Sequence, residues 1–206
     1  MSEMKKGVLM VVSGPAGSGK GTVVKALREK MPELALSVSA TTRSPRPGEV
    51  DGVNYYYITR EEFESRIADG EILEYTEYCG NLYGTPAEGV RRVLEEGRDI
   101  VLEIEVDGAE QIRRKFPDAV SVMLIPPDGN TLERRLRDRG TETNDVILER
   151  LARARIELGL AEKYDYIAVN YDGGVDDCAE TLRAILISEH CRYGSMRSVT
   201  DSFFEM

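Results

Sequence analysis

The sequence has little of several features on which whole classes of function depend. It contains a single histidine, His190, so a histidine-based metal cluster is excluded. Its three cysteines are odd in number and scattered, which is typical of reduced thiols in the cytoplasm and not of a disulfide framework. No apolar run approaches the ~20 residues that a membrane-spanning helix needs. The apolar stretch that follows Lys6 covers only five residues, and we expect a first strand there, not a signal peptide.

Positive charge is also in short supply. The chain has 37 acidic residues and only 27 lysines and arginines, which gives a net charge of −10 and a pI of about 4.8. This balance argues against nucleic acid or an anionic membrane as the main partner. With 206 residues, of which 41% are hydrophobic and 31% charged, the chain suits one globular domain with small insertions.

One stretch joins an apolar strand to a glycine-rich loop. Residues 8–12 are all apolar, as in a strand that a parallel sheet buries on both faces. After Lys20 a helical pattern begins, with one apolar face formed by Val23, Val24, Leu27 and Met31. Between them lies G-x-x-x-x-G-K, a loop whose backbone N–H groups can surround one anion next to a helix N-terminus. We therefore expect ATP phosphates to bind at Gly14, Pro15, Ala16, Gly17, Ser18, Gly19, Lys20, Gly21 and Thr22.

Within this loop, Lys20 would bring a mobile positive charge to the β- and γ-phosphates. Gly21 follows the lysine, and the hydroxyl comes one position later, at Thr22. This departure from the common order leaves open whether Thr22 contacts Mg²⁺ directly or through water. The alternative is a glycine-rich turn without function, but the order of strand, loop, lysine and helix favours phosphate binding.

The rest of the chain alternates strands and helices. Strands are expected at residues 34–39, 55–58, 72–78, 100–105, 119–125 and 166–170. Helices are expected from 59 to 70, from 85 onward, and at 108–115, 132–138, 145–163 and 175–190, with Thr59 and Thr85 as N-caps. This order predicts an α/β fold: a doubly wound parallel sheet of about five strands, with ligands at the carboxyl ends of the strands. Residues 40–85 would form a small β-rich insertion, and residues 191–206 lack periodicity and would be a loosely ordered tail.

A polar loop supplies a second candidate site. Arg43 and Arg46 are separated by a stiffening proline and present two guanidinium forks that match a phosphate. Tyr55 and Tyr83 would add neutral hydroxyl donors to the same anion. The alternative is a solvated loop with surface arginines.

A third cluster is acidic. Glu103, Glu105 and Asp107 alternate along the expected strand and would share a face at its carboxyl end. Unpaired carboxylates buried in a central strand would be costly, so we expect them to face bound nucleotides, Mg²⁺ or nearby arginines.

The fourth cluster is basic, with four arginines within the six positions 134–139. Arg135 and Arg139 are four residues apart and so lie on one helix face. In an acidic protein this stretch indicates a lid that closes on phosphates, whereas on an ordinary helix it would be a solvated face.

With these motifs the sequence resembles the guanylate kinases, nucleoside monophosphate kinases of the P-loop fold, over residues 7–190. The likeness is most specific at residues 14–22, 39–55, 80–85 and 135–143. It implies ATP-dependent phosphorylation of GMP and dGMP to GDP and dGDP, with Mg²⁺, in cytoplasmic purine nucleotide metabolism. It also implies a core of residues 1–39 and 86–190, a GMP-binding insertion at about 40–85 and a short Arg-rich lid at about 134–150.

The resemblance further implies roles for single residues. The 5′-phosphate of GMP would be held by Arg43, Arg46, Tyr55 and Tyr83, and the guanine base by Ser39, Glu74 and Thr85. Glu103 and Glu105 would line the same site, and Asn170 would lie near the adenine of ATP. The transferred phosphoryl group would be surrounded by Lys20, Arg43, Arg135, Arg139 and Arg150. A carboxylate at Glu74 can accept from both N1–H and N2–H₂ of guanine, a pair of donors that adenine lacks. The exact roles of Glu105 and Asp107 stay open, because the family often carries Asp and Gln at some of these places.

Two alternatives remain beside this interpretation. Catalytically inactive domains of the same architecture bind phosphorylated peptides, but they have typically lost phosphate-loop residues, whereas this chain retains Lys20. The second alternative is a kinase of the same fold that acts on another phosphorylated sugar or nucleotide. Such an enzyme would not need Ser39, Glu74 and Thr85 to bind guanine. The expected partners are therefore ATP and GMP, without nucleic acid or membrane, and the sequence leaves monomer and homo-oligomer undecided.

Overall fold

In the computed structural model, residues 7–78, 80–138, 140 and 143–203 are described. Five parallel strands form the central sheet, in the order β2-β7-β1-β8-β9. Their bounds are β1 Leu9–Ser13, β2 Ala35–Leu36, β7 Ile100–Glu103, β8 Val120–Ile125 and β9 Tyr166–Val169. All five residues of β1, in the middle, are buried, as expected for a strand with helices on both faces. The predicted α/β fold with a five-stranded parallel sheet is confirmed.

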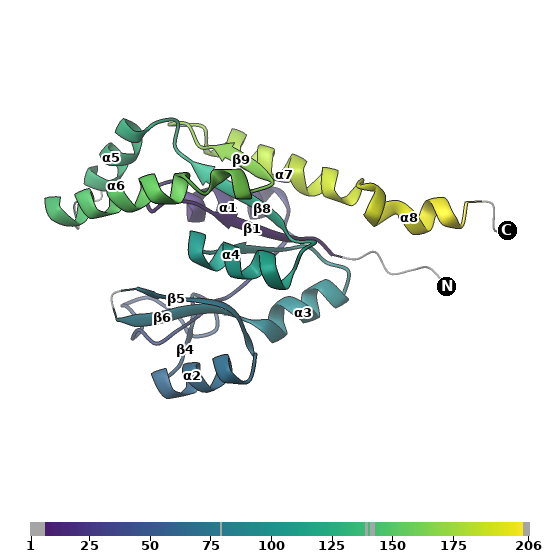
Figure 1. The fold of residues 1–206 in the computed structure, drawn as a ribbon, viewed down its shortest axis with the longest axis horizontal. Coiled ribbons are helices and arrows are strands. Elements are labelled where there is room, and N and C mark those ends of the chain that lie inside the picture. Colours follow the sequence, from purple (N-terminus) through teal and green to yellow (C-terminus); the bar gives the residue numbers. More distant parts are fainter. Residues whose placement is uncertain (1–6, 79, 139, 141–142, 204–206) are drawn as a thin grey trace.

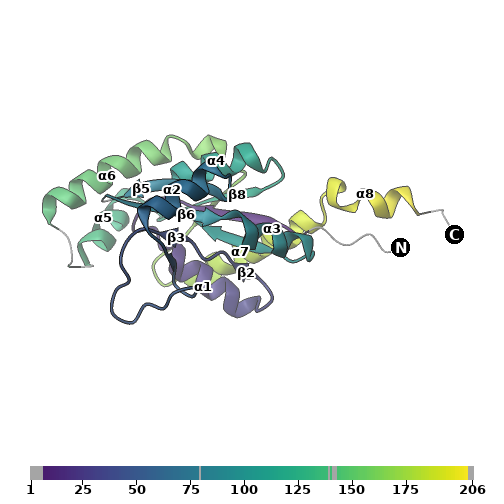
Figure 2. The same ribbon diagram turned by 90° about the horizontal axis from the view of Figure 1, so that it is seen from below.

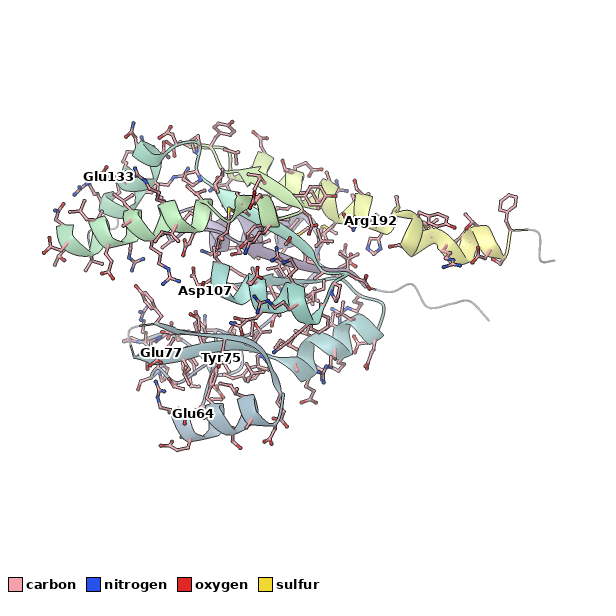
Figure 3. The ribbon with its side chains drawn as sticks, viewed as in Figure 1. Glu64, Tyr75, Glu77, Asp107, Glu133 and Arg192 are labelled. Carbon is pink, nitrogen blue, oxygen red and sulfur yellow. The ribbon has the colours of Figure 1, made fainter. Side chains whose placement is uncertain are left out.

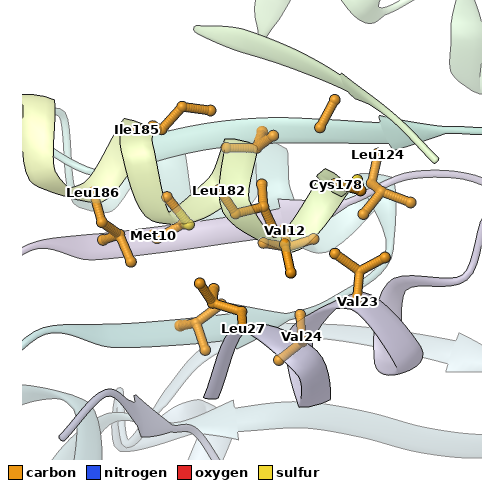
Figure 4. Packing of buried hydrophobic residues seen from close by; sticks show 14 of the residues in the cluster. Met10, Val12, Val23, Val24, Leu27, Leu124, Cys178, Leu182, Ile185 and Leu186 are labelled. Atoms are coloured by element: carbon orange, nitrogen blue, oxygen red, sulfur yellow. The ribbon is translucent and has the colours of Figure 1, made fainter. Parts of the chain in front are cut away.

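Helices cover the two faces of this sheet, and the alternation of β1 side chains decides which face each helix buries. Met10 and Val12 pack against α1 (Lys20–Lys30) and α7 (Val175–His190) (Figure 4). Leu9 and Val11 point the other way, toward α3 (Ala87–Glu95) and α4 (Val106–Lys115). Figure 2 shows α1 and α7 on one side of the sheet and α4 on the other. Each large apolar side chain buried in these layers stabilises the fold by roughly 1.5–3 kcal/mol.

The predicted insertion forms a separate four-stranded sheet in the order β4-β3-β6-β5, below α4 in Figure 1. Its strands are β3 Ala40–Thr41, β4 Tyr56–Tyr57, β5 Ile72–Tyr78 and β6 Asn81–Pro86, and helix α2 spans Arg60–Ala68. Phe63 of α2 is fully buried against Ala40, Ile72 and Leu82, which holds the helix to the sheet. The Thr59 hydroxyl accepts the Glu62 N–H at 3.1 Å, so the predicted N-cap of α2 is confirmed.

The remaining helices are α5 (Gly129–Asp138), α6 (Asn144–Leu158), the short 3-10 helix η1 (Ala161–Lys163) and α8 (Tyr193–Asp201). Leu132 and Leu136 of α5 pack against Ile147 and Ala154 of α6. Among the described residues, no helix combines the length and the apolar character that crossing a membrane requires.

Several predicted elements differ from the structure. The expected strand at 34–39 is shortened to β2, because the chain leaves the central sheet after Leu36 and crosses to the inserted sheet, where β3 begins at Ala40. The predicted N-cap at Thr85 is wrong: Pro86 holds that position, and Thr85 lies inside β6 with its hydroxyl bound elsewhere. The tail expected to be loosely ordered contains helix α8, in which Tyr193, Met196 and Val199 follow one another at a helical spacing of three.

Candidate active site

The loop between β1 and α1 has the shape that its glycines require. Gly14 and Gly19 have φ angles of 144° and 94°, in the region that favours glycine. Both are also closely approached by other segments. A Cβ atom on Gly14 would lie 2.1 Å from the Leu124 carbonyl oxygen, and one on Gly19 would lie 2.4 Å from Asn170 Nδ2. A side chain at Gly14 would therefore displace the backbone of β8, and one at Gly19 would displace the buried Asn170 side chain.

Lys20 is the first residue of α1, and its side chain turns back into this loop. Nζ donates a 2.6 Å hydrogen bond to the Gly14 carbonyl and lies 3.7 Å from Glu105 Oε2. The side chain is only 9% exposed. The ammonium group thus lies inside the curve of the loop, beside a carboxylate.

Of the three acids Glu103, Glu105 and Asp107, the first two lie near Lys20 and the third does not. Glu103 ends β7, and Glu105 is the N-cap of α4. Burial raises the pKa of Glu103, and the nearby Lys20 ammonium opposes that rise. Asp107 belongs to the first turn of α4, where it is exposed and pairs with Arg153 at 2.9 Å. The prediction that all three share one strand face is wrong, because the chain turns into a helix at Glu105.

Gly21, where the loop departs from the common pattern, lies against Glu103. A Cβ atom at Gly21 would lie 3.2 Å from Glu103 Oε1. Such contact is tighter than a side chain normally tolerates, so glycine leaves the space that the Glu103 carboxylate occupies. Thr22, the next residue, is exposed and lines the cleft above the loop.

Two clefts meet over these residues. One, of about 460 Å³, is lined by most of the loop from Pro15 to Thr22 together with Arg150, Arg153 and Glu157. The other, of about 380 Å³, lies over the inserted sheet, and its lining includes Ser39, Tyr55, Glu74 and Tyr83. Both are lined by Lys20, Thr76, Tyr78, Glu103 and Glu105. Each volume is that of a small-molecule site, and Lys20 lies at the junction.

Glu74 lines the second cleft and pairs with Thr85, which is buried behind it. The Thr85 hydroxyl donates a 2.7 Å hydrogen bond to Glu74 Oε1. Glu74 is only 3% exposed, and burial raises the pKa of its carboxyl to about 7. Ser39 lines the same cleft, so the structure brings together the three residues expected to read a base.

The expected phosphate-binding residues are gathered only in part. The Arg43 guanidinium donates to both carboxylate oxygens of Glu49 at 3.0 Å and lies 5.5 Å from the Tyr55 ring centroid. Tyr83 packs edge-on against Tyr55, with ring centroids 6.0 Å apart. Arg46 differs: it is exposed on the loop, and its backbone N–H donates to Glu49 at 2.7 Å.

Glu49 and Tyr57 are residues that sequence reasoning missed. The Tyr57 hydroxyl donates to Glu49 at 2.8 Å, so Glu49 organises Arg43, Arg46 and Tyr57. Its hydrogen bond with Arg43 lowers the pKa of the Glu49 carboxyl to about 2. Glu49 lies six positions after Arg43 in the same loop, and this spacing is a sequence signal from which their ion pair could have been predicted.

On the loop side, Arg135 and Asn170 lie together. Arg135 Nη2 donates to the Asn170 carbonyl at 2.9 Å and pairs with Asp172 at 2.8 Å. The Asn170 side chain is buried, and its Nδ2 donates to the Ser18 carbonyl at 2.9 Å. Its Oδ1 is buried without a hydrogen-bond partner in the described part of the chain.

Arg150 lies elsewhere, on α6, and donates to the Tyr78 hydroxyl at 2.7 Å. Arg139 falls outside the described residues.

Known proteins are similar to this chain in sequence and in structure. The family model described as guanylate kinase matches residues 6–189. This chain belongs to the guanylate kinase family. The guanylate kinase of Halalkalibacterium halodurans is 49% identical over 190 residues, which cover 92% of each chain. That of Lactobacillus delbrueckii subsp. bulgaricus is 48% identical over 202 residues, 98% of this chain and 97% of the relative.

One solved structure supports the same family, and another is similar in fold alone. The crystal structure of guanylate kinase from Anaplasma phagocytophilum superposes with a TM-score of 0.73 at 32% identity, covering 91% of this chain and 88% of that one. A shikimate kinase from Acinetobacter baumannii, at 16% identity and a TM-score of 0.50, shares the fold alone. The guanylate kinase resemblance expected from the motifs is thus confirmed.

Proposed function

We propose that ATP binds in the cleft over the phosphate loop and that GMP binds in the cleft over the inserted sheet. The reaction itself, ATP-dependent phosphorylation of GMP to GDP, follows from membership of the guanylate kinase family. The observation that carries the assignment is that the two clefts meet at Lys20 while the rest of their linings differ. One offers a phosphate loop, and the other offers a buried carboxylate with tyrosines, one of which lies beside Arg43.

On the ATP side, backbone N–H groups of the loop and the start of α1 would hold the phosphates. Arg135 and Arg150 would add positive charge from α5 and α6. The Asn170 side chain, whose Oδ1 is buried without a partner among the described residues, would accept from the amino group of adenine. Arg139, and with it the lid at 134–150, stays a prediction from the sequence.

On the GMP side, Glu74 would accept from N1–H and N2–H₂ of guanine, with Thr85 and Ser39 beside it. Arg43, Tyr55 and Tyr83 would hold the 5′-phosphate. The support for this assignment is that Glu74, Tyr55 and Tyr83 line one cleft. The Arg43 guanidinium lies 5.5 Å from the Tyr55 ring centroid. Arg46, which is exposed here, would have to turn its side chain inward to contribute.

Mg²⁺ is the cofactor that we propose. Thr22 is exposed and lines the loop cleft together with Glu103 and Glu105. Oxygen donors of this kind suit Mg²⁺, which keeps several waters and is bound largely through substrate phosphates. Among the described residues, no group of three or more histidine, cysteine or acidic side chains forms a metal site of its own. When bound, the ion would neutralise charge on the ATP phosphates.

The residues of the site account for catalysis without a general base. Phosphoryl transfer has a loose transition state, so positioning and charge stabilisation supply most of the rate. The acceptor oxygen belongs to a phosphate whose second pKa is about 6, and it is ionised at neutral pH. Lys20 at the junction of the clefts would stabilise the charge on the group in transit, with Arg43, Arg135 and Arg150 around it. Approach of the inserted sheet to the core would exclude water that would otherwise hydrolyse ATP.

An assay of ADP release with ATP, Mg²⁺ and each of GMP, dGMP, AMP, UMP and CMP tests this function. GMP and dGMP should be the productive acceptors. Binding of GMP without ADP release would favour the phosphopeptide-binding alternative, and preference for another acceptor would favour a different kinase of this fold. We also propose the cytoplasm as the location, on the basis of the scattered cysteines.

A further inference from the structure

Helix α4 presents one face to β5 next to Glu74. Gly108, Gln111 and Lys115 are three and four residues apart, so they share that face of the helix. Each of them meets β5 at or beside Glu74. Figure 3 shows Tyr75 and Glu77 on the inserted sheet, with α4 above them.

Gln111 takes the place of a neighbouring strand. Its Nε2 donates to the Tyr75 carbonyl at 2.8 Å, and its Oε1 accepts from the Tyr75 N–H at 3.2 Å. In the described sheet β5 is an edge strand, because the order is β4-β3-β6-β5. One side chain therefore satisfies both backbone groups of the residue that follows Glu74.

Lys115 holds the backbone on the other side of Glu74. Its Nζ donates to the Leu73 carbonyl at 2.5 Å and lies 3.4 Å from the Ile72 carbonyl. The residues immediately before and after Glu74 are thus both hydrogen-bonded to side chains of α4.

These contacts matter because the pairing of β5 with β6 is irregular at this point. Ile72 is opposite Pro86 and Tyr75 is opposite Gly84, so the register shifts across Leu73 and Glu74. Such a bulge interrupts the ladder and redirects a side chain. The direction of Glu74 therefore depends on α4 as well as on the neighbouring strand.

Gly108 completes the arrangement by leaving room. A Cβ atom on Gly108 would lie 2.3 Å from Glu74 Oε2 and 3.0 Å from its carboxyl carbon. The carboxylate consequently rests against the backbone of α4, with its other oxygen bound to Thr85.

We propose that Gln111 is a positioning residue for guanine recognition, which fixes β5 at Tyr75 and so aims the Glu74 carboxylate at the base. Gly108 is the accompanying specificity determinant, because only a residue without a side chain leaves the carboxylate its place. The inference rests on the proposed function, since Glu74 must be the residue that reads guanine. Helix α4 packs in the core layer. Through Gln111 and Gly108, base recognition therefore also depends on how the core holds the inserted sheet.

The test is the Gln111→Met variant, which keeps the length of the side chain and removes both hydrogen bonds. Steady-state kinetics would be measured with GMP and with IMP, which lacks the 2-amino group that Glu74 is expected to bind. We expect kcat/KM for GMP to fall roughly tenfold, the GMP-to-IMP ratio to shrink, and KM for ATP to stay within about twofold. Arg114→Met, a change at a 75% exposed position of the same helix, is the matched control and should leave the ratio unchanged.

A double-mutant cycle with Glu74→Gln distinguishes an effect of Gln111 on the orientation of Glu74 from general damage to the structure. If Gln111 acts through Glu74, Gln111→Met should cost little more in the Glu74→Gln background. Full additivity of the two losses, or an unchanged GMP-to-IMP ratio in Gln111→Met, would overturn the proposal. If Glu74→Gln alone leaves the ratio unchanged, the proposed function fails instead. Gly108→Ala supplies a second variant in case Gln111→Met does not fold, and it should shrink the same ratio. An unchanged GMP-to-IMP ratio in Gly108→Ala would also contradict the proposal.

Discussion

The Thr85 hydroxyl donates a 2.7 Å hydrogen bond to Glu74 Oε1 where the glutamate is only 3% exposed. This bond orients the carboxylate, and burial keeps water from satisfying its remaining lone pairs. Threonine and glutamate come from two adjacent strands whose register shifts beside them. A ligand with two adjacent donors would therefore find an acceptor that is already oriented and poorly solvated.

The Glu74→Gln variant should lose catalytic efficiency with GMP. Glutamine keeps one acceptor and turns an NH₂ group toward guanine donors, which leaves buried donors facing each other. The expected loss in kcat/KM is at least about 1–3 kcal/mol, the cost of an unsatisfied buried polar group. Discrimination against AMP should shrink, and KM for ATP should barely change. Steady-state kinetics with GMP and AMP measure this, with Glu77→Gln at a 55% exposed position of the same strand as control. An unchanged GMP-to-AMP ratio in Glu74→Gln would show that this residue does not read the base.

GMP affinity should depend on pH near neutrality. Burial raises the pKa of Glu74 to about 7, and only the ionised form can accept both guanine donors. The Kd for GMP should therefore rise as the pH falls below about 7, approaching tenfold per pH unit, while the Glu74→Gln variant lacks this component. Ionisation of the GMP phosphate affects both proteins alike, so the difference between their pH profiles isolates Glu74. Calorimetric titrations at pH 5.5–8.5 would measure it, and parallel profiles would count against the assignment.

The same carboxyl should affect stability in the nucleotide-free protein. Its folded-state pKa lies above its ordinary value of 4.5, so its favourable contribution is complete below pH 4.5 and is lost as the pH rises through about 7. Glu74→Gln, which is neutral throughout, should gain stability relative to the parent between these limits. The gain should be on the order of 3 kcal/mol at pH 8. Urea unfolding of both proteins at pH 5 and pH 8 measures it, and a difference that does not change with pH would refute the expectation.

Lys20→Ala should reduce turnover far more than stability. The ammonium group bonds only to carbonyls of its own loop and lies near Glu105 in the described structure, so the core does not depend on it. Loss of one preorganised charge at the transition state costs about 2.7–4 kcal/mol, or 10²–10³ in kcat. Lys25→Ala, on an exposed face of the same helix, should leave kcat unchanged. Near-normal turnover of Lys20→Ala would contradict the role of the junction.

Arg43→Ala and Arg135→Ala should separate the two nucleotide sites. Arg43 lies with Tyr55 in the inserted segment, so its loss should mainly raise KM for GMP. Arg135 binds the Asn170 carbonyl beside the phosphate loop, so its loss should mainly raise KM for ATP or lower kcat. Initial rates over a grid of both substrates would measure the two effects. If the variants share one kinetic defect, the division into two clefts is wrong.

The sequence by itself determined the features that short segments encode. A short all-apolar run before a turn is typical of a buried strand, left-handed turns favour glycine, and a threonine followed by a glutamate three positions later is typical of a helix N-cap. For these reasons β1, the loop from Gly14 to Thr22 and the start of α2 are where the sequence predicts them. Resemblance to a family added Glu74, which local pattern alone would have assigned to the surface.

Tertiary structure decided the contacts between segments that are distant in the chain. Thr85 matched a helix cap locally, yet its hydroxyl binds Glu74, because a side chain bonds to whichever partner packing places within reach. Asp107 matched a strand face, but helix α4 begins at Val106, after its N-cap Glu105, and Asp107 pairs with Arg153. Gln111 carries no local signal, since its role depends on a strand edge 36 residues away that only the packing of α4 on β5 brings near.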